Sequence, residues 1–321
     1  MNRLITQTNK RLQEADYLKA VLILLMVAFH LVYIGDHYPQ MKEVVYLFHM
    51  SSFCVLSGFF YARTNASNWW HRTKTLLIPY LILESGYILM ASITPVREHI
   101  AQLTPALFFK HLFLSPLGPY WYLHTLLFVL MTKKAASFLI PQWNSARAHF
   151  LWLAITLFLY IALHQWAPTL YYCRFFFYGV LISWGGNLLR YFWKSWWSII
   201  PIAILIGIRE KYHFPSTGFT QWLLTYLMMG LLFKSYRILP QAGMRILGFW
   251  GRNTLVVLFF SPLFTFLSKL YQPFFTQWDP SGILFLGISL IVVMGGCLGV
   301  AQILDWLHLS PLLGRKRLLS S

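Results

Sequence analysis

The sequence predicts an all-α protein, a polytopic transmembrane bundle of about ten helices with both termini in the cytoplasm. Hydrophobic residues make up 58% of the chain and charged residues only 11%, whereas a soluble domain carries roughly 25% charged residues. Apolar runs recur from one end of the chain to the other, separated by short polar stretches. No stretch alternates with the period of two residues that a membrane β-barrel requires.

The charge distribution predicts the topology and argues against one class of partner. The net charge of +17 would suit a nucleic-acid-binding protein, but the Lys and Arg residues lie in separate short loops rather than on one patch. They concentrate in every second loop, as the positive-inside rule expects for an even number of spans. We therefore expect a single membrane domain over residues 1–321, with a cytoplasmic leader (1–16), a cytoplasmic basic tail (305–321) and no nucleic-acid partner.

The expected spans follow the apolar runs in chain order, and charged residues, Pro and Gly mark their ends. They are 17–34, 44–62, 76–94, 119–132, 148–166, 172–189, 196–208, 219–233, 253–268 and 283–304. Residues 133–147 are expected to form an amphipathic linker, and residues 234–252 a basic loop. The three cysteines have neither a metal-binding spacing nor the pattern of a disulfide framework, so no metal site is expected.

Lys19 and His30 stand eleven positions apart in the first apolar run, DYLKAVLILLMVAFH. At about 100° per residue they lie on nearly the same helix face, with a rise of ~16 Å between them. Lys19 is then at one membrane surface, and His30 lies near the middle of the bilayer or beyond. An imidazole in hydrocarbon needs a polar cavity or a partner, which makes His30 a candidate functional residue. The alternative is a snorkelling lysine and a histidine bonded to a neighbouring helix.

Two further polar residues lie inside apolar runs. Glu84, in the third expected span, can orient a histidine, hold a substrate hydroxyl or act as a protonated structural hydrogen-bonding group. His49 lies in FHMSSFCVLSGFF, roughly on the same helix face as Ser57. Close helix packing also explains the small residues of that run.

Trp121, His124 and Arg174 are weaker candidates for substrate binding. Trp121 belongs to an aromatic cluster at the start of the fourth expected span, and His124 follows it. Aromatic residues at a span end usually anchor it at the membrane interface, although they also stack on sugar rings. Arg174 lies near the outer end of the sixth expected span, where snorkelling is the simplest explanation.

Three cations are expected at one membrane surface. Arg72 and Lys74 stand just before the third expected span, beside Lys19 at the inner end of the first. Basic loop residues are topology signals in most membrane proteins. Three together also suit a polyanion such as the phosphates of coenzyme A.

Five segments carry a resemblance to a known family. The first is a basic residue, ten intervening positions and a histidine, here Lys19 to His30; the others are FHMSSFCVLSGFF, HRTKTLLIPY, PYWYLHTLLF and GRNTLVVLFFSPLF. In this order they resemble the acyltransferase 3 family of integral membrane O-acyltransferases, and most nearly its fucose 4-O-acetylase-like branch. Two positions depart from the family pattern. Thr75 stands where the loop before the third span often has a second arginine, and Ser261 stands where the late segment often ends in histidine.

The resemblance implies transfer of an acyl group, most often acetyl, from acyl-CoA to a carbohydrate hydroxyl in a bacterial cell membrane. The implied partners are acyl-CoA, the carbohydrate acceptor and the lipid bilayer, with glycan-assembly enzymes as further candidates. Acetyl-CoA is the donor substrate, and no tightly bound cofactor is expected. His30 is then the general base that takes the hydroxyl proton. The other implied roles are orientation of His30 by Glu84 or His49, donor-phosphate binding by Lys19, Arg72 and Lys74, and acceptor binding by Trp121, His124 and Arg174.

Two other functions use the same polar residues. A transporter or flippase for a glycan or lipid-linked sugar needs intramembrane polar groups, but the sequence has no paired broken helices in two halves. A catalytically inactive subunit of a polysaccharide assembly complex would be compatible with Ser261.

Overall fold

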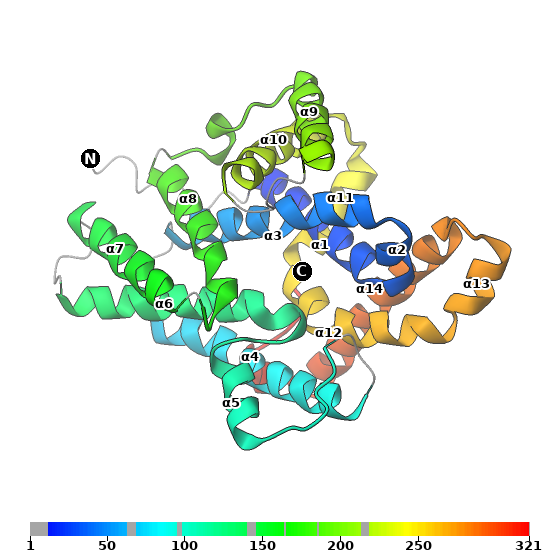
Figure 1. Cartoon of the computed structure of the whole chain (residues 1–321), viewed down its shortest axis with the longest axis horizontal. Coiled ribbons are helices and arrows are strands. Elements are labelled where there is room, and N and C mark those ends of the chain that lie inside the picture. Colours follow the sequence, from blue (N-terminus) through cyan, green and yellow to red (C-terminus); the bar gives the residue numbers. More distant parts are fainter. Residues whose placement is uncertain are drawn as a thin grey trace. The chain divides into compact units, whose positions relative to one another are not determined.

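The computed structural model describes residues 12–62, 69–94, 98–139, 146–163, 165–184, 186–212 and 218–320 (Figure 1). Within these ranges every regular element is an α-helix or a 3₁₀-helix, which confirms the predicted all-α class. Most of the predicted leader, residues 1–11, lies outside the described residues. The chain folds into two compact units. Unit 1 comprises Met1–Arg63, Tyr178–Ala301 and Leu319–Ser321, and Unit 2 comprises Thr64–Phe177 and Gln302–Leu318.

Unit 1 begins with a helix that ends at its histidine. Helix α1 (Gln13–His30) stops because Leu31 has extended backbone (φ −66°, ψ 113°), and a six-residue helix, α2 (Val32–His37), follows. The predicted first span, 17–34, is therefore broken directly after His30. The other helices of Unit 1 are α3 (Pro39–Ala62), most of α8 (Cys173–Trp184), α9 (Ile199–Tyr212), α10 (Phe219–Ser235), α11 (Gln241–Arg252), α12 (Thr254–Leu267), α13 (Gln272–Trp278) and most of α14 (Ile283–Trp306).

Close backbone approaches at glycines hold the core of Unit 1 together. A Cβ atom at Gly251 would lie 1.8 Å from the carbonyl oxygen of Asp16, so α11 packs directly against α1. A Cβ atom at Gly179 would lie 1.9 Å from the carbonyl oxygen of Val55, where α8 meets α3. Small residues allow such contacts between helices in a membrane.

Residues 234–252 are not the basic loop that the sequence predicts. They contain α11, whose axis is bent by 79° from that of the following helix. The apolar residues of QAGMRILGFWGR have helical spacing, but its three glycines and two arginines favour the prediction of a loop. Packing against α1 stabilises this helix, and that contact is not visible in the sequence.

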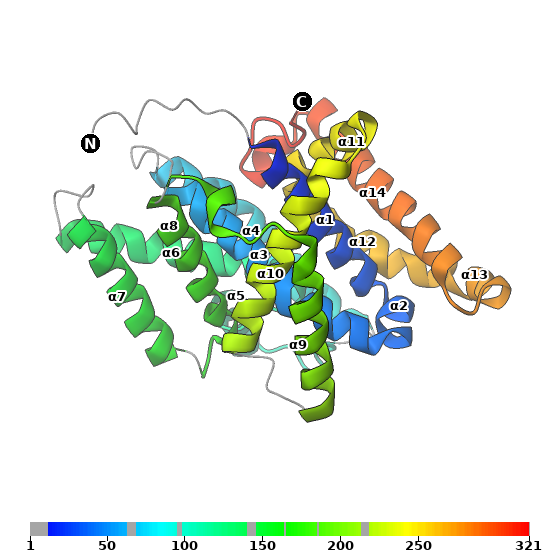
Figure 2. The same ribbon diagram turned by 90° about the horizontal axis from the view of Figure 1, so that it is seen from above.

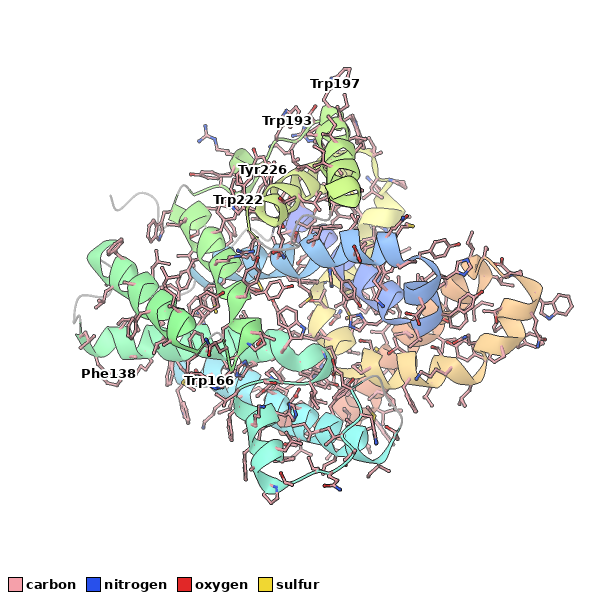
Figure 3. The ribbon with its side chains drawn as sticks, viewed as in Figure 1. Phe138, Trp166, Trp193, Trp197, Trp222 and Tyr226 are labelled. Carbon is pink, nitrogen blue, oxygen red and sulfur yellow. The ribbon has the colours of Figure 1, made fainter. Side chains whose placement is uncertain are left out.

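Exposed and half-buried aromatic side chains line α10 and the segment that leads into α9. Phe219, Trp222 and Tyr226 stack in succession, with ring centroids 6.0 Å and 5.9 Å apart. Figure 3 shows Trp222 and Tyr226 on α10, and Figure 2 shows α9 and α10 side by side. Trp197, just before α9, has 71% of its surface exposed. Such a surface is typical of a helix that faces lipid.

Unit 2 is built on α4 (Trp69–Ile93) and α6 (Trp121–Leu139). Its other elements are α5 (Pro105–Phe113), η2 (Gly118–Tyr120), α7 (Ala146–Leu163), η3 (Pro168–Tyr172) and η8 (Ser310–Leu313). Helix α6 continues through Lys133 to Leu139, so the first part of the predicted linker 133–147 is helical. It is stabilised there by α7, where the hydroxyl of Thr156 donates to that of Thr132 (2.7 Å).

Among the described residues, three helices are long and apolar enough to cross a membrane: α4, α14, and α3 over Pro39–Tyr61. A fourth span is present if the bent pair α11 and α12 forms one crossing. The described helices α7 and α9 include shorter apolar segments. The chain is thus an all-helical protein with several candidate membrane helices, and the ten spans and cytoplasmic termini stay predictions.

Candidate functional site

His30 is the last residue of α1, and its side chain is exposed. Its Nδ1 lies 2.7 Å from the carbonyl oxygen of Met26. A carbonyl oxygen only accepts hydrogen bonds, so Nδ1 is the nitrogen that carries the hydrogen. The lone pair of the neutral imidazole is then on Nε2. The end of the helix thus presents a ring whose tautomer is set by its own backbone.

His49 lies near His30 in Unit 1, and Tyr46 lies next to both. The ring centroid of Tyr46 is 5.9 Å from that of His30 and 5.2 Å from that of His49. The Tyr46 hydroxyl donates to the carbonyl oxygen of Phe29 (3.3 Å), which joins α3 to the end of α1. Tyr46 is not among the residues predicted from the sequence. Its position three residues before His49, on the same face of α3, was the available signal.

The His49 ring has the same hydrogen-bond pattern but a different environment. Its Nδ1 lies 2.7 Å from the carbonyl oxygen of Val45, so Nδ1 carries the hydrogen. The side chain is buried, and its Nε2 has no hydrogen-bond partner. A buried acceptor without a donor costs free energy, and such an atom in a native protein calls for a functional or solvent-mediated explanation.

Lys19 lies near the start of α1, on the same helix as His30. Its Nζ is 3.4 Å from Oδ1 of Asp16 and 4.6 Å from the ring centroid of Phe60. The Asp16 carboxylate therefore offsets part of the charge that is predicted to bind a donor phosphate.

Glu84 lies in Unit 2, whereas His30 and His49 lie in Unit 1. It is fully buried in α4, and its Oε1 accepts a hydrogen bond from the backbone N–H of Leu117 (2.6 Å). Its Oε2 has no hydrogen-bond partner. Nearby, the Tyr80 hydroxyl donates to the carbonyl oxygen of Leu112 (2.6 Å). These bonds attach the end of α5 and the segment that follows it to α4.

His124 stands at the same segment, on α6. Its Nε2 lies 2.9 Å from the carbonyl oxygen of Phe113, so Nε2 carries the hydrogen and Nδ1 the lone pair. That Nδ1 is buried without a hydrogen-bond partner. The ring centroid of His124 lies 5.8 Å from that of Tyr80. Oε2 of Glu84 and Nδ1 of His124 are therefore both buried polar atoms of Unit 2 without a hydrogen-bond partner.

The aromatic and cationic candidates of Unit 2 pack against their neighbours. The Trp121 ring lies 4.5 Å from that of Tyr172. The Arg174 guanidinium carbon lies 3.5 Å from the ring centroid of Tyr171. Lys74 lies 5.0 Å from the ring centroid of Trp70. These contacts fit the structural explanations of Trp121 and Arg174 as well as a binding role.

Ser261 stands in Unit 1, within α12, where the resembled family often has histidine. It is buried, and its carbonyl oxygen accepts from the hydroxyl of Thr265 (2.9 Å). The small side chain of Ser261 is accommodated here by ordinary helix packing.

Comparison with family models identifies the chain. The model described as an acyltransferase domain, Acyl_transf_3, matches residues 12–302 and so extends through both units. Searches of curated proteins and of solved structures returned no match. The family match covers most of the chain, including His30, His49, Glu84 and the two cations of the first turns of α4, Arg72 and Lys74. The protein therefore belongs to the acyltransferase 3 family of membrane proteins.

Proposed function

We propose that the protein is a membrane-embedded O-acyltransferase that moves an acetyl group from acetyl-CoA to a hydroxyl of a cell-surface or lipid-linked carbohydrate. His30 is the general base. The observation that carries this proposal is the bond from Nδ1 of His30 to the carbonyl oxygen of Met26 (2.7 Å), which makes Nε2 the basic nitrogen of the neutral, exposed ring. The family match supports the acyltransferase class.

The proposed reaction needs one base and no further cofactor. Nε2 of His30 takes the hydroxyl proton while the hydroxyl oxygen attacks the thioester carbonyl carbon. The resulting tetrahedral intermediate collapses, and the C–S bond breaks. The departing thiolate of coenzyme A takes the proton from the imidazolium, which regenerates neutral His30. The products are the sugar ester and coenzyme A.

His49 and Tyr46 are positioning residues in this proposal. Tyr46 contacts both histidine rings and is bonded to the backbone residue next to His30. A ring held in this way limits the rotation of its neighbour, and precise orientation accounts for much of the efficiency of a general base. Glu84 is the other candidate from the sequence for orienting His30.

We assign acceptor binding to Glu84, His124 and Trp121. The partnerless atoms Oε2 of Glu84 and Nδ1 of His124 are both acceptors when Glu84 is ionised. A carbohydrate offers several hydroxyl donors, so it satisfies such a pair, and an aromatic ring packs on the apolar face of a sugar. Arg174 is a weaker candidate, because the Tyr171 ring already covers its guanidinium.

The donor phosphates are assigned to Arg72, Lys74 and Lys19. Lys19 is the weakest of the three, since it also contacts Asp16. The proposed location is the bacterial cell membrane, as a multi-pass protein next to glycan-assembly enzymes.

The test is acetyl transfer from radiolabelled acetyl-CoA into the glycan of membranes that contain the protein. His30→Ala should lower transfer by at least about 100-fold, because general-base catalysis contributes 10² to 10⁴ in rate. His37→Ala is the matched control, since His37 is another exposed histidine that ends a short helix of the same unit. Wild-type transfer in His30→Ala at equal protein levels would contradict the assignment. Absence of transfer with the wild-type protein would favour the transporter or the inactive subunit.

A further inference from the structure

We propose that Lys133 and Arg315 join Arg72 in a binding site for the phosphate groups of the acyl donor, at the end of Unit 2 where α4 begins. This inference rests on the proposed function. It adds two residues to those predicted from the sequence, one from the end of α6 and one from the C-terminal segment.

Helix α6 brings Lys133 to the first turns of α4. The indole Nε1 of Trp69 donates to the carbonyl oxygen of Leu130 (3.0 Å), which joins the first residue of α4 to the later part of α6. Arg72 follows Trp69 by three residues, so it projects from nearly the same face of α4. Lys133 is only 8% exposed and interacts electrostatically with Arg72.

Two like charges in this position favour an anion. Their mutual repulsion is stronger in a partly buried site than in water, because the local dielectric constant is lower. A phosphate group between them replaces the repulsion by two charge-assisted hydrogen bonds. Lys133 also has its Nζ 5.2 Å from the ring centroid of Trp152, which keeps the side chain in the protein interior.

The C-terminal segment adds Arg315 to the same end of α4. Helix η8 packs against α4, and Gly314 directly after it has φ +72°. A Cβ atom at Gly314 would lie 3.0 Å from the carbonyl oxygen of Lys74. Arg315, the next residue, therefore lies beside the turn of α4 that carries Lys74. Burial lowers the pKa of the Arg315 guanidinium, which is the expected effect when a cation is removed from water.

The segment is fixed in place by an acidic residue that is already bonded. Asp305 accepts hydrogen bonds from the Ser310 hydroxyl and, at 2.7 Å, from the backbone N–H of Leu318. The other two acidic residues of Unit 2, Glu84 and Glu98, are bonded to the backbone of Leu117 and Gly118, next to the first turn of α6. Five of the described cations lie at this end of α4. They are Arg72, Lys74, Lys133, Lys134 and Arg315.

The experiment measures coenzyme A binding to the full-length protein by isothermal titration, in nanodiscs of zwitterionic lipid. Lys133→Gln and Arg315→Gln should each weaken binding about tenfold, since each removes one charge-assisted contact. Lys133→Arg keeps the charge and should bind within about threefold of wild type. The control is Lys269→Gln, an exposed cation of Unit 1, and it should bind as wild type does. A variant whose thermal unfolding temperature equals that of wild type is folded. If Lys133→Gln does not fold, Arg315→Gln and Lys133→Arg still test the proposal.

The outcomes separate this inference from the proposed function. If the wild-type protein does not bind coenzyme A, the donor assignment fails and this inference fails with it. If wild type binds and the Gln variants bind equally well, the inference alone is wrong. A second arm uses nanodiscs with phosphatidylglycerol, because a lipid headgroup presents the same phosphate chemistry. If wild type and the Gln variants bind coenzyme A equally in that arm, lipid headgroups occupy the cations, and the proposal is overturned.

Discussion

At the scale of single residues, hydrogen bonds to backbone carbonyl oxygens determine which histidine nitrogen can act. Nδ1 of His30 and of His49 each lies 2.7 Å from a carbonyl oxygen four residues earlier. The two rings then differ in exposure, since His30 is exposed and His49 is 2% exposed. A reacting hydroxyl reaches the exposed ring more easily, which is why His30 is the proposed base.

The Glu84 carboxylate combines a structural and a binding role, and two substitutions separate them. Glu84→Leu leaves the Leu117 N–H without its acceptor and should lower the free energy of unfolding by about 1–3 kcal/mol. Glu84→Gln retains an oxygen acceptor and should fold nearly as wild type, while raising KM for the acceptor. Denaturation in SDS and acceptor titrations measure the two effects. An unchanged acceptor KM in Glu84→Gln would limit Glu84 to its structural role.

Asp279 illustrates a pH-dependent contact outside the candidate spans. Its carboxylate accepts from the backbone N–H groups of Leu284 (2.8 Å) and Ser281 (3.0 Å), and these bonds hold the pKa of the carboxyl below its usual range. Because the folded-state pKa is lowered, the stabilisation is present above the ordinary pKa of Asp and is lost as pH falls through the lowered value. Asp279→Ala should thus melt earlier than wild type at pH 7. Melting curves at falling pH should show this difference shrink, and a constant difference would contradict the assignment.

At the scale of elements, packing decides which stretches are helical. Helix α11 forms in a stretch with three glycines because it packs on α1, and α6 continues past two lysines because α7 packs beside it. The first contact joins segments more than 200 residues apart, and the second joins consecutive helices. After α1, in contrast, a helix stops within an apolar stretch of sequence. It ends at His30, the proposed general base.

The contact of α11 with α1 predicts a sharp difference between two glycines. A Cβ atom at Gly251 would meet the carbonyl oxygen of Asp16 at 1.8 Å, whereas at Gly248 the nearest atom is the end of the Arg252 side chain at 3.8 Å. Gly251→Ala should therefore destabilise the protein by about 3 kcal/mol, with a large loss of folded yield. Gly248→Ala should have little effect or stabilise α11 slightly. Size-exclusion profiles and melting temperatures in detergent compare the two, and equal yields would show that α11 can move away from α1.

At the scale of the whole molecule, the length and hydropathy of helices support three or four crossings, while the charge distribution predicts ten. Many of the expected spans correspond to helices that are shorter or less apolar than an independent span requires. Such helices are compatible with a bundle in which neighbours, rather than lipid, cover part of the surface.

Cysteine labelling tests the topology. The three native cysteines are buried, so an introduced cysteine gives the main signal. With ten spans and both ends inside, Lys316→Cys should react with an impermeant maleimide only in permeabilised cells, because the tail is cytoplasmic. Ser281→Cys, in the turn before α14, should react in intact cells. Labelling of both on one side would mean that the number of spans between residues 281 and 316 is even, and the reverse pattern would mean that the orientation is inverted.

Composition and the order of short motifs were enough to predict the helical class, the membrane character and the family. They also pointed to His30, His49 and Glu84 as candidates, since a polar group within an apolar run is conspicuous. The three-dimensional packing was needed to show which polar atoms are satisfied, where α1 ends, and that Tyr46, Lys133 and Arg315 lie beside the candidate residues. These features depend on contacts between residues far apart in the chain, and such contacts cannot be predicted from the local sequence pattern.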